Sequence, residues 1–301
     1  MKIFLTLKGI IVFISAIAVL VFLLWLFLSY SYHPSYYFYS PDGLNFTQKG
    51  KAFNAFGANS AIVLKDGNIA LYGIDFNPLI RFVGFTDSQT KYKVTDFGLI
   101  VSSDGKKFQR KKITVRNLTE NIQTNGDATI VQLPDGNYRL YFAHYGNGPV
   151  VSFYSENGYD FLYEGKLEPE VHFVDPTIIY EKRAQKYYIY TRGKNDREIK
   201  MYESNDGKYF HSRPSIDPPF YLKFTIIDQG EYYQAYGLPA AMVEREKSPG
   251  QDFRYPLLAT STDALNWQKA SEQPTGQWKD GKIEVNAGAG VKLTNGGYIF
   301  Y

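Results

Sequence analysis

Two aspartates stand at matching places in the sequence, each directly before a short apolar run. Asp127 opens the segment D-A-T-I, and Asp175 opens the segment D-P-T-I. Two carboxyl groups that are brought together repel one another, and one of them resists ionisation unless a cation or donor intervenes. Such a pair suits general acid–base catalysis, in which one group gives a proton and the other accepts one. The alternative is that each aspartate caps its strand through the backbone amide two residues on.

Two histidines, His144 and His172, lie close to these segments. Either could donate a hydrogen bond to a ligand or act as a general acid, and a partly exposed loop histidine is the alternative. The sequence has no cysteine and no His-x-His or His-x-x-x-His pair. Neither thiolate catalysis nor a catalytic metal is therefore indicated, and we expect no cofactor.

A turn motif of the form Ser-x-Asp-Gly recurs along the chain, with an aromatic residue six positions after the serine. Asn replaces Asp in the third copy, and Ala replaces Gly in the fifth. The serines are Ser40, Ser102, Ser155, Ser204 and Ser261, and the aromatics are Phe46, Phe108, Phe161, Phe210 and Trp267. Ser and Asp side chains cap turn amides and Gly accepts a positive φ, so we expect these turns to be structural. A β-forming repeat of about fifty residues predicts propeller blades.

The segment 127–161 predicts one complete blade, because its apolar and aromatic runs alternate with turns in the manner of successive hairpins. The two ends of the chain supply the halves of another blade. Ala289–Leu293 and Tyr298–Tyr301 read as its first two strands, and Tyr36–Thr47 reads as its last two. Propellers close their ring by joining such halves in one sheet. We therefore predict an all-β, five-bladed β-propeller.

These features together resemble the five-bladed propeller glycosidases, namely the arabinanase/xylosidase and invertase/fructosidase families. The resemblance rests on the five turns and on an inner strand that opens with Asp-Pro-Thr, and it covers residues 35–301. It implies a carbohydrate ligand at the propeller axis, on the face where the innermost strands begin. It also implies three carboxylates, of which one activates water or attacks, one protonates the leaving oxygen, and one orients the others.

The positions that match those carboxylates are mixed in this chain. Asp127 and Asp175 are the candidate catalytic acids, whereas the first and fourth blades offer Asn59 and Lys223. The resemblance gives Asn59, Lys223, His144 and His172 the role of substrate-binding residues. A third acid in register is missing. Glu170, Glu198 and Glu231 could reach the axis from loops, and spacing does not select among them.

Two functional classes remain open. One is a glycoside hydrolase, which the retained aspartate pair favours, and the other is a non-catalytic propeller that binds a glycan or a protein. The missing acid in the first blade favours the second class. A sialidase-like reader of acidic sugars ranks last, because it needs converging arginines and the arginines share no repeat position.

The N-terminal region carries twenty-one residues without a charge, Gly9–Ser29. A helix of this length spans roughly 30 Å, the thickness of a bilayer core. A cleaved signal peptide is the rival, although its apolar region is usually shorter. Lys2 and Lys8 precede the span, which predicts a cytoplasmic segment 1–8, a membrane helix 9–29 and an extracytoplasmic propeller 30–301.

The charge pattern excludes one large class of partner. The net charge is only +3, and acidic and basic residues are interspersed. A protein that binds nucleic acid usually presents a basic stripe, often with interleaved aromatic residues. We therefore expect partners to be a carbohydrate and a membrane, and no nucleic acid.

Overall fold

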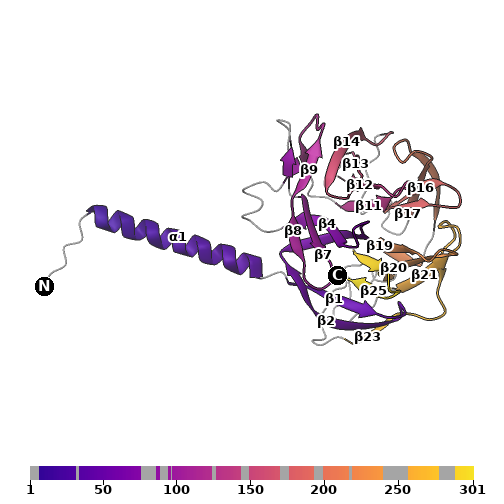
Figure 1. Ribbon diagram of the computed structural model, residues 1–301, viewed down its shortest axis with the longest axis horizontal. Helices are drawn as coiled ribbons and strands as arrows, with labels where there is room; N and C mark the ends of the chain where they lie inside the picture. The colour runs from indigo at the N-terminus through magenta and orange to yellow at the C-terminus, as the bar shows by residue number, and fades with distance from the viewer. Residues whose placement is uncertain are drawn as a thin grey trace.

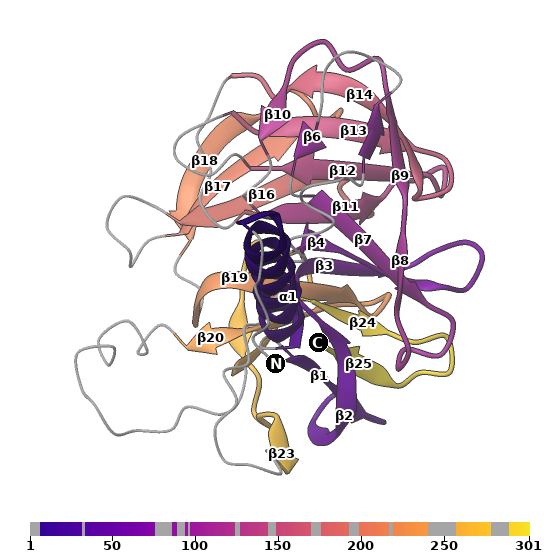
Figure 2. The same cartoon turned by 90° about the vertical axis from the view of Figure 1, so that its left-hand side faces the viewer.

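The computed structural model describes residues 7–31, 34–75, 86–88, 94–95, 97–123, 127–143, 149–169, 176–192, 199–216, 219–239, 257–277 and 289–301. These residues form one N-terminal helix and a ring of β-sheets (Figure 1). Seen along the helix, the sheets are arranged like blades around a common axis (Figure 2). The architecture is the five-bladed β-propeller that the turn repeat predicted.

The helix α1 (Leu7–Ser31) contains the predicted membrane span and extends it slightly at both ends. Its window Gly9–Leu26 has a mean hydropathy of 2.9, and within the described residues it is the helix long and apolar enough to cross a bilayer. Its apolar side chains point to all sides and are exposed from Ile10 to Trp25, whereas Leu26 is buried. A helix that is apolar all round fits a lipid environment better than a half-buried surface.

Five sheets form the blades, and their strands follow one another from the axis outward. Blade I has β3 (Phe56–Val63), β4 (Ile69–Asp75), β7 (Phe97–Ser102) and β8 (Gln109–Lys111). Blade II has β11 (Ala128–Gln132), β12 (Tyr138–Phe142), β13 (Val151–Ser155) and β14 (Asp160–Lys166), extended by β9 (Ile113–Arg116) and β5 (Thr86–Ser88). Blade III has β15 (Thr177–Glu181), β16 (Lys186–Arg192), β17 (Ile199–Ser204) and β18 (His211–Ile216).

The remaining blades follow the same plan. Blade IV has β19 (Phe220–Asp228), β20 (Tyr233–Pro239), β21 (Leu257–Ser261) and β22 (Gln268–Lys269). Blade V has β24 (Gly290–Lys292), β25 (Tyr298–Phe300), β1 (Pro34–Ser40) and β2 (Asn45–Asn54), with β23 (Thr275–Gln277) at its rim. A small parallel pair, β6 (Val94–Thr95) and β10 (Ile122–Gln123), lies outside the blades.

Blade V confirms the predicted closure of the ring. Strand β1 pairs with β25 in antiparallel register, with Tyr39 opposite Ile299. The sheet therefore joins the last strands of the sequence to the first, and no seam is left between them. In blade I the inner strand β3 accommodates Asn59 as an extra residue in a bulge.

Because the strands of each blade are antiparallel, the two faces of the propeller carry opposite ends of the inner strands. The first and third strands of each blade run in one direction, and the second and fourth strands return. We call the face at which β3, β11, β15, β19 and β24 begin the site face. The opposite face carries the Ser-x-Asp-Gly turns, and we call it the turn face.

The Ser-x-Asp-Gly turns are held by their own side chains, as the sequence predicted. In the first copy Ser40 Oγ accepts from the backbone N–H of Gly43 at 2.9 Å, and Asp42 Oδ1 accepts from that of Leu44 at 2.8 Å. Gly43 has a φ of 79°, which an L side chain rarely adopts. In the second copy the N–H groups of Lys107 and Lys106 hold the pKa of Asp104 at about 2.

Each blade is fastened to the turn of the next blade by a buried tyrosine hydroxyl, which we call the tyrosine latch. Tyr72 donates to the carbonyl of Gly158 at 2.7 Å, and burial raises its pKa well above the ordinary value, so the hydroxyl keeps its proton. The same bond recurs around the ring, from Tyr141 to Gly207, Tyr190 to Ala264, Tyr236 to Gly43 and Tyr301 to Gly105. Every latch therefore connects one blade to its neighbour.

The aromatic residue of each turn packs against the latch tyrosine that binds that turn. Phe161 lies edge-on to Tyr72, with ring centroids 6.1 Å apart, and Phe108 lies edge-on to Tyr301 at 5.0 Å. Five hydrophobic clusters fill the spaces between neighbouring blades, one at each junction. The hydrophobic core is thus divided into five clusters, one at each blade junction, and each cluster contains one latch tyrosine or packs against it.

Removing one latch hydroxyl should weaken the whole ring. Tyr72→Phe leaves the buried carbonyl of Gly158 without this donor, and we expect a loss of about 1–3 kcal/mol of unfolding free energy. Chemical denaturation of the full-length protein in detergent measures it, with Tyr209→Phe as the control because Tyr209 is half exposed. An unchanged denaturation midpoint in Tyr72→Phe would show that the latch is dispensable.

Candidate functional site

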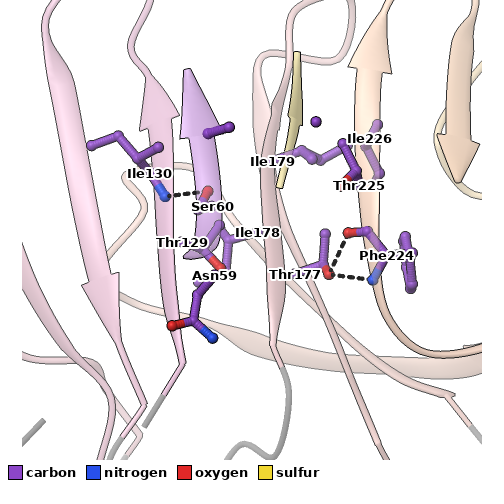
Figure 3. A pocket seen from close by; sticks show the side chains of 12 residues that line it. Asn59, Ser60, Thr129, Ile130, Thr177, Ile178, Ile179, Phe224, Thr225 and Ile226 are labelled. Carbon is purple, nitrogen blue, oxygen red and sulfur yellow. Dashed lines mark hydrogen bonds between the residues drawn. The ribbon is translucent and has the colours of Figure 1, made fainter. Parts of the chain in front are cut away.

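The inner strands of all five blades surround a small cavity on the propeller axis. It has a volume of about 70 Å³ and is lined from β3, β11, β15, β19 and β24 (Figure 3). Its lining includes Asn59, Thr129, Thr177, Thr225 and Gly290. This is well below the roughly 300–1,000 Å³ of pockets that hold small molecules. The cavity is therefore too small to enclose a ligand of that size.

A set of hydroxyl groups ties the inner strands to one another around this axis. Thr129 Oγ1 donates to the carbonyl of Pro176 at 2.9 Å, and Thr177 Oγ1 donates to that of Phe224 at 3.0 Å. In blade I, Ser60 Oγ accepts from the backbone N–H of Ile130 at 3.2 Å. These three residues oppose Tyr141, Tyr190 and Tyr72 on the second strands, so they are equivalent positions of the repeat. These hydrogen bonds fix the positions of neighbouring inner strands relative to one another along the propeller axis.

Asn59 is positioned by a β-bulge. The register of β3 against β4 shifts between Ala58 and Ser60, which leaves Asn59 as the extra residue. A bulge re-aims a side chain, and bulges are frequent next to active sites. In this protein Asn59 Nδ2 crosses to blade II and donates to Asp127 Oδ1 at 2.7 Å. The other amide atom, Oδ1, is buried, and among the described residues no hydrogen-bond donor meets it.

Asp127 lies directly before β11 at the site face and is half-buried. Its carbonyl accepts from the N–H of Ala143 at 3.0 Å, which continues the β11–β12 pairing by one step. Its carboxylate faces Asn59 of the neighbouring blade. The structure thus shows Asp127 and Asn59 hydrogen-bonded to one another across blades I and II, and their catalytic and substrate-binding roles stay predictions.

The second aspartate lies outside the described residues, as do His144, His172, Glu170 and Glu198. Pro176, which follows Asp175, is buried, and its carbonyl accepts a hydrogen bond from Thr129 Oγ1. Thr129 is two positions after Asp127, just as Thr177 is two positions after Asp175. Convergence of Asp127 and Asp175 on one pocket stays a prediction, and the hydroxyl bond between their strands supports it.

Two other candidates have clear places along the chain. Lys223 lies in β19 directly before Phe224, and its side chain lies outside the described residues. Glu231 was expected to be able to reach the axis from its loop, and this expectation was wrong. It is exposed in the turn between β19 and β20, on the turn face, at the far end of the inner strand from Asp127. Within the described part of the chain, no cluster of three or more His, Asp or Glu side chains could hold a metal.

Among the described residues, the site offers one carboxylate and one amide where blades I and II meet. Asp127 can accept hydrogen bonds from donor groups at this face, whereas Oδ1 of Asn59 is buried. Sequence reasoning missed the hydroxyl set of Ser60, Thr129 and Thr177. A signal for it existed, because Thr129, Thr177 and Thr225 each stand two positions after a candidate site residue, namely Asp127, Asp175 and Lys223.

A second carboxylate at position 59 should make stability depend on pH. In Asn59→Asp a carboxyl oxygen replaces the amide that lies 2.7 Å from Asp127 Oδ1. Two carboxylates at this distance cannot both ionise, so the folded pKa of the pair is raised above the unfolded value. The variant should then be most stable at low pH and lose stability as pH rises through the raised pKa, by about 1.4 kcal/mol per unit of the shift.

Chemical unfolding between about pH 4 and pH 8 measures this dependence. The matched control is Asn59→Ala, which removes the same hydrogen bond to Asp127 without adding a charge, so Asn59→Asp should lose more stability than this control as pH rises. Identical profiles for the two variants would show that positions 59 and 127 do not interact in the folded protein.

Comparison with solved structures identifies the fold. No model of a protein family matches the sequence, and a search of curated proteins finds no match. An alpha-L-arabinofuranosidase from Clostridium thermocellum is 17% identical over 80% of each chain, with a TM-score of 0.55. A family 117 glycoside hydrolase from Zobellia galactanivorans is 13% identical over 79% of this chain and 75% of that one, with a TM-score of 0.49. The similarity to the arabinofuranosidase shows that this chain has the fold of a five-bladed propeller.

Proposed function

We propose that the protein is a glycoside-hydrolase-like propeller that takes a glycan at its site face, above the Asn59–Asp127 pair. The observation that carries the proposal is the hydrogen bond between these two side chains at the mouth of the axis. Sugar hydroxyls can donate hydrogen bonds, and this pair holds the half-buried carboxylate of Asp127 at the site face, where it can accept them. The likeness in fold to an arabinofuranosidase supports a carbohydrate as the ligand class.

In the hydrolytic form of the proposal, Asp127 and Asp175 flank the glycosidic bond. One carboxyl protonates the leaving oxygen, and the other activates a water molecule or attacks the sugar. Lys223, His144 and His172 supply hydrogen-bond donors to the sugar hydroxyls, and no cofactor takes part. The repeat supports this arrangement, because neighbouring blades are related by about one-fifth of a turn and matching positions therefore lie at similar depth.

The second candidate is a propeller that binds a glycan without cleaving it. The specific observation in its favour is Asn59, because the first blade presents an amide where the related glycosidases are expected to carry an acid. An amide neither gives nor takes a proton near neutral pH, so it can orient a sugar but cannot replace a catalytic carboxyl.

One set of variants separates the two candidates. We expect Asp127→Asn and Asp175→Asn each to lower hydrolysis of an aryl glycoside by roughly 10²–10⁴-fold, because a proton-transfer group is lost. Binding of arabinan, xylan, galactan and fructan fragments, measured by calorimetry, should weaken much less.

Three other results have distinct meanings. An unaltered protein that binds a fragment and hydrolyses none is a binding propeller. Variants that lose stability but keep turnover or binding support strand capping, and the catalytic roles are then dropped. An unaltered protein that neither binds nor cleaves any fragment contradicts the proposed function.

We further propose that α1 remains in the membrane, with residues 1–8 in the cytoplasm and the propeller outside. The charge-free helix and the two preceding lysines support this. The protein should stay in the membrane fraction after carbonate washing, and protease added outside the cell should digest the propeller. A soluble mature protein that begins near residue 31 would show instead that the segment is a cleaved signal.

A further inference from the structure

The topology fixes the face of the propeller to which the helix is attached. β1 is the third strand of blade V, so it runs in the same direction as the inner strand β24 and begins at the site face. Its first residue, Pro34, pairs with Asn54, the last residue of β2. α1 ends at Ser31, three Cα steps before Pro34, which reach at most about 11 Å. The helix is therefore tethered closely to the site face.

The packing of α1 agrees with this attachment. Leu26, near the propeller end of the helix, is only 6% exposed, whereas the large apolar residues before it are 42–69% exposed. In a view along the helix the blades appear on several sides of it, and its connection to β1 places its propeller end at the site face (Figure 2). When α1 spans a bilayer, the same face must turn toward the lipid headgroups.

We propose that the site face is apposed to the membrane, and that its ligand is the glycan headgroup of a membrane lipid and not a free polysaccharide. The inference rests on the proposed function and on the retained anchor. The hydroxyls of such a headgroup lie at the membrane surface. The short tether holds the site face, with Asn59 and Asp127, close to that surface. A soluble polymer, in contrast, would have to enter the narrow space between propeller and bilayer.

The absence of cysteine makes the orientation directly measurable, because one introduced thiol can be labelled without a competing site. Two exposed positions of blade III form a matched pair. Ser215 lies near the site-face end of β18, and Asn205 lies in the turn between β17 and β18 on the turn face. The six residues of β17 separate the faces by about 20 Å.

The experiment reconstitutes full-length Ser215→Cys and Asn205→Cys, each with a thiol-linked fluorophore, into phosphatidylcholine vesicles that contain a headgroup-labelled quencher lipid. We expect markedly stronger quenching at position 215. A flexible Gly/Ser insert of about 30 residues between Ser31 and Pro34 spans roughly 30 Å and should bring the two labels to similar quenching. Equal quenching without the insert, or stronger quenching at position 205, overturns the proposal.

The ligand source is tested in the same vesicles. The arabinan, xylan, galactan and fructan fragments are offered free in solution or coupled to a dialkyl lipid in the protein's own bilayer. Confinement beside the site should favour a lipid-borne fragment by about tenfold or more at equal total concentration, and the insert should reduce this preference. Equal or better use of the free fragment overturns the inference while the proposed function stands. Failure of both forms of every fragment overturns the proposed function and this inference together.

Discussion

The fold depends on a hydrogen bond between a buried tyrosine hydroxyl and the carbonyl of a tight turn in the next blade. A buried carbonyl without a donor is costly, and a buried hydroxyl without an acceptor is equally so. The turn can offer its carbonyl at the right place because a glycine or alanine at that position adopts a positive φ, as Gly158 and Ala264 do. The turn's own aromatic residue then packs on the tyrosine ring. One local motif thus supplies the acceptor and the hydrophobic cover for the junction between two blades.

This dependence explains which parts of the fold could be predicted from the sequence. The turns were recognisable because Ser40, Asp42 and Gly43 act on one another within four residues. The closure of blade V followed from counting complementary strands. The latch tyrosines were not recognised, since the role of Tyr72 depends on Gly158, which is 86 positions away in the sequence. Periodicity identifies such a tyrosine as buried, but the partner of its hydroxyl is decided by the packing of two separate sheets.

The sequence predicted some features of the site and not others. Asp127 and Asn59 were both placed at the axis by their position in the repeat, but their contact could not be foreseen, because it depends on the bulge that re-aims Asn59. Glu231 could not be excluded as an axial acid from the sequence, because a loop acid has no repeat position that fixes the face on which it lies. Repetition therefore predicts which strand carries a residue, but it does not predict the partners of its side chain in a neighbouring blade.

The pairing of β1 with β25 also has a kinetic consequence. β1 and β2 directly follow the helix, yet the strands that cover their inner edge are the last in the sequence. The latch between Tyr301 and Gly105 joins residues 196 positions apart. Contacts at such sequence separations form slowly, because the entropy of closing a long loop must be overcome first. During synthesis the edge of β1 that pairs with β25 therefore stays unpaired until β25 has been made. Blade V is then the last part of the ring to assemble.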